Sequence, residues 1–118
     1  MNDRCAYVIN LAKELSMDYV DQYNAMEEFA RWNLPEEIGL EWIDAEEMGI
    51  IGSDELIQSM SYDSIILLKE IVKNFNNAFE DPTMDEVWTH EAMQKHVFWN
   101  NQRLLAKRFL NTVSQSVE

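Results

Sequence analysis

Apolar residues recur at intervals of three and four along most of this chain, and no segment alternates apolar and polar residues as a strand would. That interval is the spacing of one face of an α-helix, whereas a half-buried strand has a period of two. With three glycines and two prolines, the sequence also has few positions that favour long loops. The spacing therefore predicts an all-α fold, a compact single-domain bundle of five or six helices over residues 1–118.

Local signals indicate where the expected helices begin and end. Ser16 is a possible start of a second helix within the first segment, Pro35 suits a first turn, and Gly49 is a typical stop. Asp81 and Thr83 compete as the cap of the fifth helix. The expected helices cover residues 4–31, 34–48, 53–60, 64–79, 83–93 and 99–112.

Each long segment has one apolar face, which is expected to form the core. Helix 64–79 has the broadest apolar face and is expected to be the most buried. In the last helix, Arg103 is expected to point outward with Lys107 and Arg108. The faces expected to lie inward are Val8, Ala12, Leu15, Tyr19, Tyr23, Met26 and Ala30 in the first segment, Leu34, Ile38, Trp42 and Ala45 in the second, and Ile65, Leu68, Ile71, Val72, Phe75, Ala78 and Phe79 in the fourth.

Acidic residues concentrate in residues 14–63, which we call the acidic region. It contains fourteen Asp and Glu residues and one base, Arg31, and so has a net charge of −13. A localised field of one sign speeds association with a basic partner by about 10- to 1000-fold and repels nucleic acid and anionic lipid. A solvated surface that serves solubility is the alternative, but such surfaces commonly place Lys one turn from Glu. The pattern therefore favours binding of a basic protein.

Two acidic faces form the predicted partner-binding surface. The main face, on helix 34–48, comprises Glu36, Glu37, Glu41, Asp44 and Glu47, and the second comprises Asp18, Asp21 and Glu28. Leu40 lies within the main face and Trp32 lies beside the second. Each of these two side chains is either covered by another helix or exposed as an apolar anchor ringed by charges, as in binding hot spots.

The glycine positions match no known catalytic or cofactor motif. Gly39, Gly49 and Gly52 form neither a phosphate-binding loop nor a nucleophile elbow. Residues 49–52 have the G-x-x-G spacing of a nucleic-acid clamp, but that module needs strands and a basic setting. We interpret these residues as a turn between helices.

Histidine and cysteine give equally little support for catalysis. Glu86 and His90 lie one turn apart on an expected helix and are interpreted as a surface pair, because a zinc site would need further ligands. Cys5 is the sole cysteine, which excludes an internal disulfide, and it is expected to be a small core residue. We expect no enzyme activity, catalytic residue, metal or cofactor.

No apolar stretch reaches the length of a signal peptide or a membrane span, and the longest strongly apolar run covers only residues 65–68. Acidic chains are also poorly suited to anionic membrane surfaces. The sequence therefore predicts a cytoplasmic protein that binds no membrane.

In size, acidity, helicity and lack of an export signal, the chain resembles the bacterial immunity proteins that protect a toxin's producer from nuclease toxins of the colicin and contact-dependent-inhibition kinds. The resemblance is one of overall character, so no residue role is taken from it. It implies an inhibitor that covers the active site or substrate-binding surface of a nuclease, which is basic because it holds phosphates. The alternatives are a DNA mimic, as in phage proteins that block restriction enzymes, and an acidic adaptor or secretion chaperone with an exposed apolar groove.

Overall fold

The computed structural model describes residues 3–116, which are helical and contain no strand. The all-α prediction is confirmed, but five or six helices is too few: these residues form seven α-helices and two short 3-10 helices. The elements are α1 (Asp3–Ser16), α2 (Tyr19–Ala25), η1 (Glu28–Asn33), α3 (Leu34–Glu47), α4 (Asp54–Ser59), α5 (Tyr62–Glu80), η2 (Pro82–Trp88), α6 (His90–Lys95) and α7 (Val97–Ser116).

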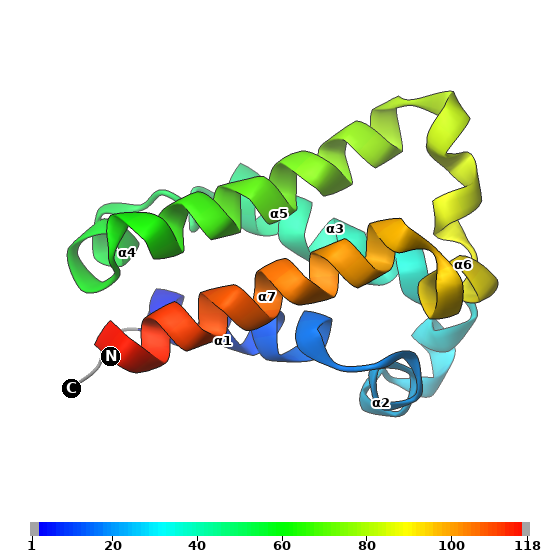
Figure 1. Ribbon diagram of the computed structural model, residues 1–118, viewed down its shortest axis with the longest axis horizontal. Coiled ribbons are helices and arrows are strands. Elements are labelled where there is room, and N and C mark those ends of the chain that lie inside the picture. The colour runs from blue at the N-terminus through cyan, green and yellow to red at the C-terminus, as the bar shows by residue number, and fades with distance from the viewer. Residues whose placement is uncertain (1–2, 117–118) are drawn as a thin grey trace.

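The four long helices form a closed bundle. Helix α7 packs against both α1 and α5, and α3 in turn contacts α5 and α1, so each long helix has two long neighbours. Figure 1 shows α5 and α7 running side by side in opposite directions, with the short elements α2, η2 and α6 gathered at one end. The molecule measures 38 × 28 × 24 Å. Within residues 3–116, no helix combines the length and apolar character that a membrane crossing requires.

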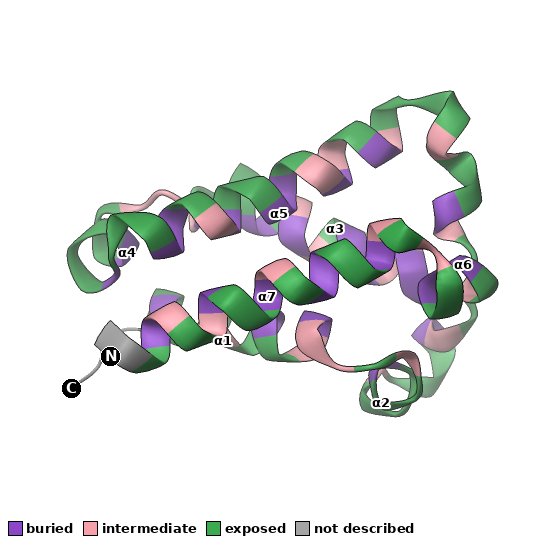
Figure 2. Cartoon of the chain, viewed as in Figure 1, coloured by how far each residue is buried: buried purple, intermediate pink, exposed green. Residues whose placement is uncertain are grey.

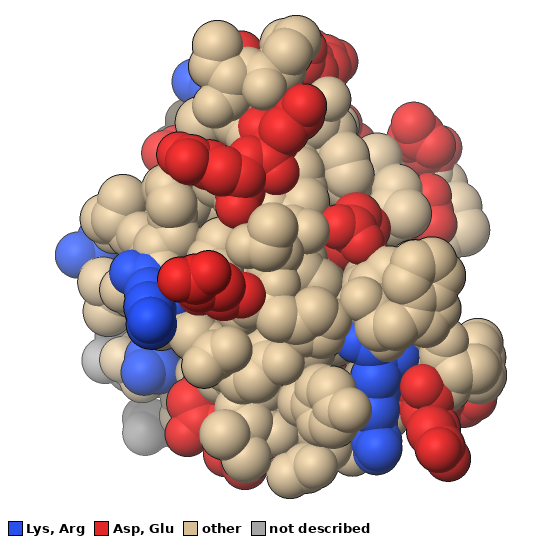
Figure 3. Space-filling model, turned by 90° about the vertical axis from the view of Figure 1, so that its right-hand side faces the viewer, with Lys and Arg blue, Asp and Glu red and all other residues tan. Residues whose placement is uncertain are grey.

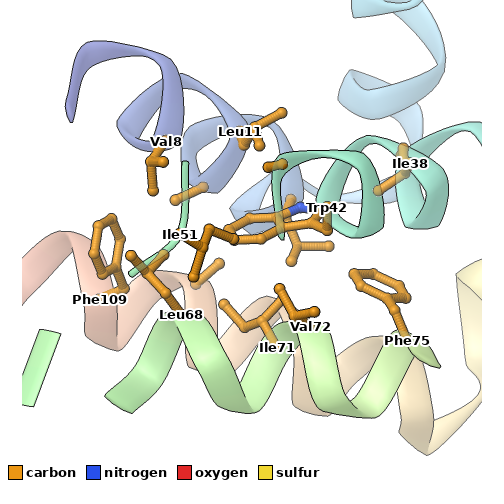
Figure 4. Packing of buried hydrophobic residues seen from close by; sticks show 14 of the residues in the cluster. Val8, Leu11, Ile38, Trp42, Ile51, Leu68, Ile71, Val72, Phe75 and Phe109 are labelled. Carbon is orange, nitrogen blue, oxygen red and sulfur yellow. The ribbon is translucent and has the colours of Figure 1, made fainter. Parts of the chain in front are cut away.

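Trp42 lies at the centre of the core and is 1% exposed. Figure 4 shows its indole between Val8 and Leu11 of α1 on one side and Ile71 and Val72 of α5 on the other. The face of α3 predicted to lie inward is confirmed, because Leu34, Ile38, Trp42 and Ala45 are all buried. Full burial of each large apolar side chain contributes roughly 1.5 to 3 kcal/mol, so this face fixes the position of α3 in the bundle.

A second cluster of buried and half-buried rings joins α5, η2 and α7. We call Phe75, Phe79, Trp88, Phe98 and Trp99 the inner aromatic cluster. The rings of Phe79 and Trp88 stack with centroids 3.9 Å apart, and Trp99 donates its indole N–H to the Val87 carbonyl at 2.7 Å. Gly39 of α3 lies against the Trp88 ring, so α3 approaches η2 closely here because this position has no side chain. Figure 2 shows the burial along these helices, with exposed residues on their outer sides.

The first expected helix is interrupted near Ser16, so the possible second start predicted there is confirmed to within a few residues, although Asp18 and not Ser16 is the cap. Helix α1 ends at Ser16, and α2 begins at Tyr19 after Asp18, whose carboxylate accepts the Asp21 N–H at 3.0 Å as an N-cap. Val8, Ala12, Leu15 and Ala30 are buried as expected, whereas Tyr23 is exposed. Tyr19 and Met26 are half-buried and pack against the core, so Tyr23 is the one member of the stripe that turns to the surface.

Arg103 contacts both sides of this break, which corrects the prediction that it points outward. Its guanidinium is buried and donates to the carbonyl of Met17 at 3.0 Å and to the side-chain oxygen of Gln22 at 2.8 Å. Burial lowers the pKa of Arg103, an effect that the nearby charge of Asp18 opposes. Arg103 of α7 therefore holds the joint between α1 and α2 through groups that a continuous helix would not present.

The segment after α5 forms two short helices instead of the one expected over residues 83–93. Asp81 is the cap: its carboxylate accepts the backbone N–H of Thr83 at 3.0 Å and the Thr83 hydroxyl at 2.7 Å. Thr89 then caps α6 by accepting the N–H of Ala92.

Between α3 and α4, Gly49 and Gly52 have φ values of +74° and +90°, which confirms the turn predicted there.

Candidate functional site

The 3-10 helix η1 displays two large aromatic side chains to solvent. A 3-10 helix has three residues per turn, so residues three apart lie on one edge. Ala30 and Asn33 form the edge that faces the protein, whereas Phe29 and Trp32 form an exposed edge and are 75% and 78% exposed. We call Phe29 and Trp32 the outer ridge. Of the two alternatives for Trp32, the structure has the exposed one.

His90 of α6 holds the backbone beneath the outer ridge. Its Nε2 lies 3.0 Å from the Trp32 carbonyl oxygen, and its Nδ1 lies 2.7 Å from the Tyr19 hydroxyl. Because a carbonyl oxygen only accepts, Nε2 donates to the Trp32 carbonyl, and Nδ1 shares the second hydrogen bond with the Tyr19 hydroxyl. One imidazole thus joins α2, η1 and α6. The interpretation of His90 as a surface partner of Glu86 is corrected: Glu86 lies in η2 and pairs with the Nε2 of His96 at 3.4 Å.

Arg31, the one base of the acidic region, is engaged within the fold. Its Nε donates to the Met26 carbonyl at 3.0 Å, and its guanidinium lies 5.0 Å from the centre of the Tyr23 ring. Among the described residues, the rings of Phe29 and Trp32 make no aromatic or cation contact. Trp32 and Phe29 are therefore open to a partner.

The second predicted acidic face is spread over two elements around this ridge. Asp18 caps α2 and Asp21 lies in the first turn of that helix, both exposed. Glu28 is exposed in the first turn of η1, next to the outer ridge. Figure 3 looks at the end of the molecule that carries α2 and α6 and shows acidic side chains in several separate groups among uncharged residues. The charge here is therefore interspersed with neutral surface.

The main predicted face on α3 divides into exposed and half-buried carboxylates. Asp44 and Glu47 are exposed, and Leu40 between them and the outer ridge is 43% exposed. Glu36 and Glu37 are half-buried, and burial raises the pKa of Glu36. Asn33 donates its side-chain amide to Glu37 at 3.1 Å, which ties the end of η1 to the first turn of α3.

Glu41 points toward α1 and pairs with another carboxyl. It shares a hydrogen bond with Glu14, and burial followed by the Glu14 charge raises the pKa of Glu41 to about 8. Two carboxyl groups hydrogen-bond only if one holds a proton, and Glu41 is the one that holds it. Burial also raises the pKa of Glu14. At neutral pH this pair carries about one negative charge between the two helices, so Glu41 contributes little to the outward field.

A surface cleft of about 500 Å³ lies beside α6 and is lined by charged groups of both signs. Lys95 forms an ion pair with Glu91 at 3.8 Å, and the Nε2 of His96 lies 3.4 Å from a Glu86 carboxylate oxygen, so these polar groups have partners within the cleft. The Nδ1 of His96 also accepts the Phe98 N–H at 3.0 Å at the start of α7. Within the described residues, no group of three or more histidine, cysteine or carboxylate side chains is arranged to hold a metal ion. Cys5 is buried, as expected of a core residue.

Sequence reasoning missed Phe29, His90 and Arg103 as parts of this site. Phe29 was detectable, since it precedes Trp32 by one 3-10 turn and follows two glutamates. His90 and Arg103 gave no local signal, because their partners lie between 58 and 86 residues away in the sequence.

Comparisons with protein-family models, with curated proteins and with solved structures found no match for this chain.

Proposed function

We propose that this chain is a small non-catalytic binding protein that neutralises a basic protein partner in the cytoplasm, and that this partner is a nuclease toxin inhibited in the manner of a bacterial immunity protein. One observation carries the proposal: the outer ridge is exposed inside a region whose net charge is −13. Folding normally buries large aromatic side chains. An exposed pair among carboxylates matches a binding hot spot, in which the rings supply affinity and the charges supply speed.

The mode of inhibition follows from the charge of nuclease sites. A surface that holds phosphates is rich in Lys and Arg, and an acidic protein that docks there excludes the nucleic acid without any catalysis. The exposed carboxylates of Asp21, Glu28, Asp44 and Glu47 are available for this contact, whereas Glu41 is withdrawn toward α1. The contact therefore centres on η1 and the outer side of α3.

The direct test begins with the neighbouring genes: the proposal predicts that one of them encodes a large exported protein with a toxic C-terminal domain, and that domain is the partner to use. Co-expression of the chain is expected to restore growth, and the purified chain is expected to inhibit the nuclease at equimolar amounts. Association should slow at least about tenfold from low to high ionic strength, with a smaller change in dissociation. Growth arrest that persists despite a folded, equally expressed chain would refute the proposal. Equal protection of DNA from unrelated restriction enzymes would replace it with the DNA-mimic alternative.

The anchors are tested in the same complex. Trp32→Ala is expected to weaken binding by about 2 kcal/mol or more, because it removes a hot-spot side chain, and Leu40→Ala by less. Tyr62→Ala is the matched control, since Tyr62 is 79% exposed but begins α5, outside both acidic faces. Helicity and thermal unfolding are measured for each variant. Equal losses of binding affinity for Trp32→Ala and Tyr62→Ala would show that the outer ridge is not part of the interface.

A further inference from the structure

The outer ridge has exposed aromatic surface and, next to it in the chain, exposed carboxylates. Phe29 and Trp32 share one edge of η1, while Glu27 and Glu28, both exposed, directly precede Phe29 in the chain. A lysine ammonium satisfies the carboxylates but is a compact, strongly hydrated charge. A guanidinium is planar and more weakly hydrated, so it stacks on a ring and donates to a carboxylate at the same time.

The fold already contains one contact of this kind. Arg31 lies over the Tyr23 ring and donates to a backbone carbonyl, so a guanidinium is held here by a ring and an oxygen together. That contact occupies Arg31 and Tyr23 and leaves the rings of Phe29 and Trp32 without a cation from the described part of the chain. The ridge therefore also offers rings with oxygen acceptors nearby, but no cation from the described part of the chain lies on its rings.

The ridge is also held in place before any partner arrives. His90 fixes the Trp32 carbonyl, Asn33 bonds Glu37, and the buried Ala30 packs against the protein. A surface fixed in this way loses less entropy on binding than a mobile loop.

We propose that Phe29 and Trp32 are a stacking platform for arginine side chains of the basic partner, with Glu27 and Glu28 accepting hydrogen bonds from the same guanidinium groups. This inference rests on the proposed function, because it assigns the chemistry of the partner at that surface. It selects an arginine-rich partner surface over a lysine-rich one of equal charge.

The probes are nona-arginine and nona-lysine peptides, titrated at low salt against the intact chain by calorimetry. The parent is expected to bind the arginine peptide at least about fivefold more tightly, because an exposed cation–π contact favours arginine and two rings take part. The double variant Phe29→Leu plus Trp32→Leu is expected to lose this preference while its affinity for the lysine peptide stays unchanged. Tyr62→Leu, at the equally exposed Tyr62, is the control and is expected to keep the preference.

Circular dichroism and thermal unfolding confirm that each variant is folded. Equal affinity of the parent for the two peptides would overturn the inference, as would an arginine preference that survives in the folded double variant. Tighter binding of a single-stranded DNA oligonucleotide than of the arginine peptide would also overturn it, since rings stack on bases as well. The toxin assay separates the two proposals: neutralisation without an arginine preference refutes only this inference, and an arginine preference without neutralisation refutes only the proposed function.

Discussion

The inner aromatic cluster and the outer ridge use the same residue types in opposite surroundings. In the cluster, Trp99 is fully buried against other rings, and its long helices α5 and α7 bury one apolar face each. In the ridge, Trp32 and Phe29 stand out from a six-residue 3-10 helix. Long amphipathic helices are positioned by apolar burial, which a short helix has too little surface to supply.

Hydrogen bonds from distant segments replace burial at the ridge end of the molecule. His90 holds η1 and α2, and Arg103 holds the joint between α1 and α2. The two parts of the chain also differ in charge. Residues 64–118 contain six bases and seven acids, whereas the acidic region contains one base and fourteen acids. The rings of the cluster therefore hold helices together, whereas the rings of the ridge are displayed at the surface, where stability does not require them.

The largest expected effect compares one tryptophan from each region. Trp99→Ala removes a buried ring and its hydrogen bond to Val87, and should lower the free energy of unfolding by about 3 to 5 kcal/mol. Trp32→Ala should change it by less than about 0.5 kcal/mol, because the exposed ring packs on little. Urea denaturation measures both. Similar losses of unfolding free energy for the two variants would show that the ridge contributes to stability as much as the cluster does.

A smaller effect is expected where α3 touches the inner aromatic cluster. A Cβ at Gly39 would lie 2.9 Å from two atoms of the Trp88 ring and 3.1 Å from Phe79. Alanine gains about 1 kcal/mol of helix propensity over glycine, but overpacking costs about 1 to 3 kcal/mol. We expect Gly39→Ala to be less stable by about 1 kcal/mol in thermal unfolding, with the exposed Asp44→Ala as control. If Gly39→Ala is more stable than the parent, the rings of Trp88 and Phe79 shift to make room for the new methyl group.

The Glu14–Glu41 pair makes the stability of the protein depend on pH through a carboxyl of the acidic region. The folded state keeps the Glu41 proton up to about pH 8, whereas the unfolded chain releases it near 4.5, so stability falls as the pH rises through this window. Glu41→Gln should remove that fall in stability. At pH 8 its free energy of unfolding should exceed that of the parent by about 1 to 2 kcal/mol, after allowance for solvent screening.

Denaturant unfolding at several pH values between 4 and 9 measures this effect. Glu47→Gln, on the exposed side of the same helix, is the control and should follow the parent curve. A parent whose stability is flat between pH 5 and 8, or a Glu41→Gln variant that falls in the same way, would show that the two carboxyls do not share a proton.

An effect no larger than that of Gly39→Ala is expected for the support beneath the ridge. His90→Ala removes hydrogen bonds to Tyr19 and Trp32, and should cost about 1 kcal/mol of stability and speed amide hydrogen exchange in residues 28–33. His90→Gln places an amide donor and a carbonyl acceptor at the same position and should recover part of the protection. Exchange in η1 that is identical in the parent and His90→Ala would show that other contacts hold the ridge.

The sequence by itself determined the long helices and their buried faces. Pro35 and Gly49 indicated where α3 starts and stops, and the bounds expected for α5 were within two residues of those found. The inward positions of Ile38, Trp42 and Leu68 follow from a period of 3.6, because a long helix has one way to bury a continuous apolar stripe. It also determined that the acidic region carries the net charge, and it left Trp32 and Leu40 open between core and surface.

Only the tertiary structure decided the details of the candidate site. The 3-10 geometry that pairs Phe29 with Trp32 and the withdrawal of Glu41 toward Glu14 depend on neighbours from other elements. Short helices have too few residues for a periodic signal, and a single buried hydrogen bond from a distant residue such as Arg103 outweighs local preference. The spacing of apolar residues does not reveal such partners, because they come together only when the long helices have packed.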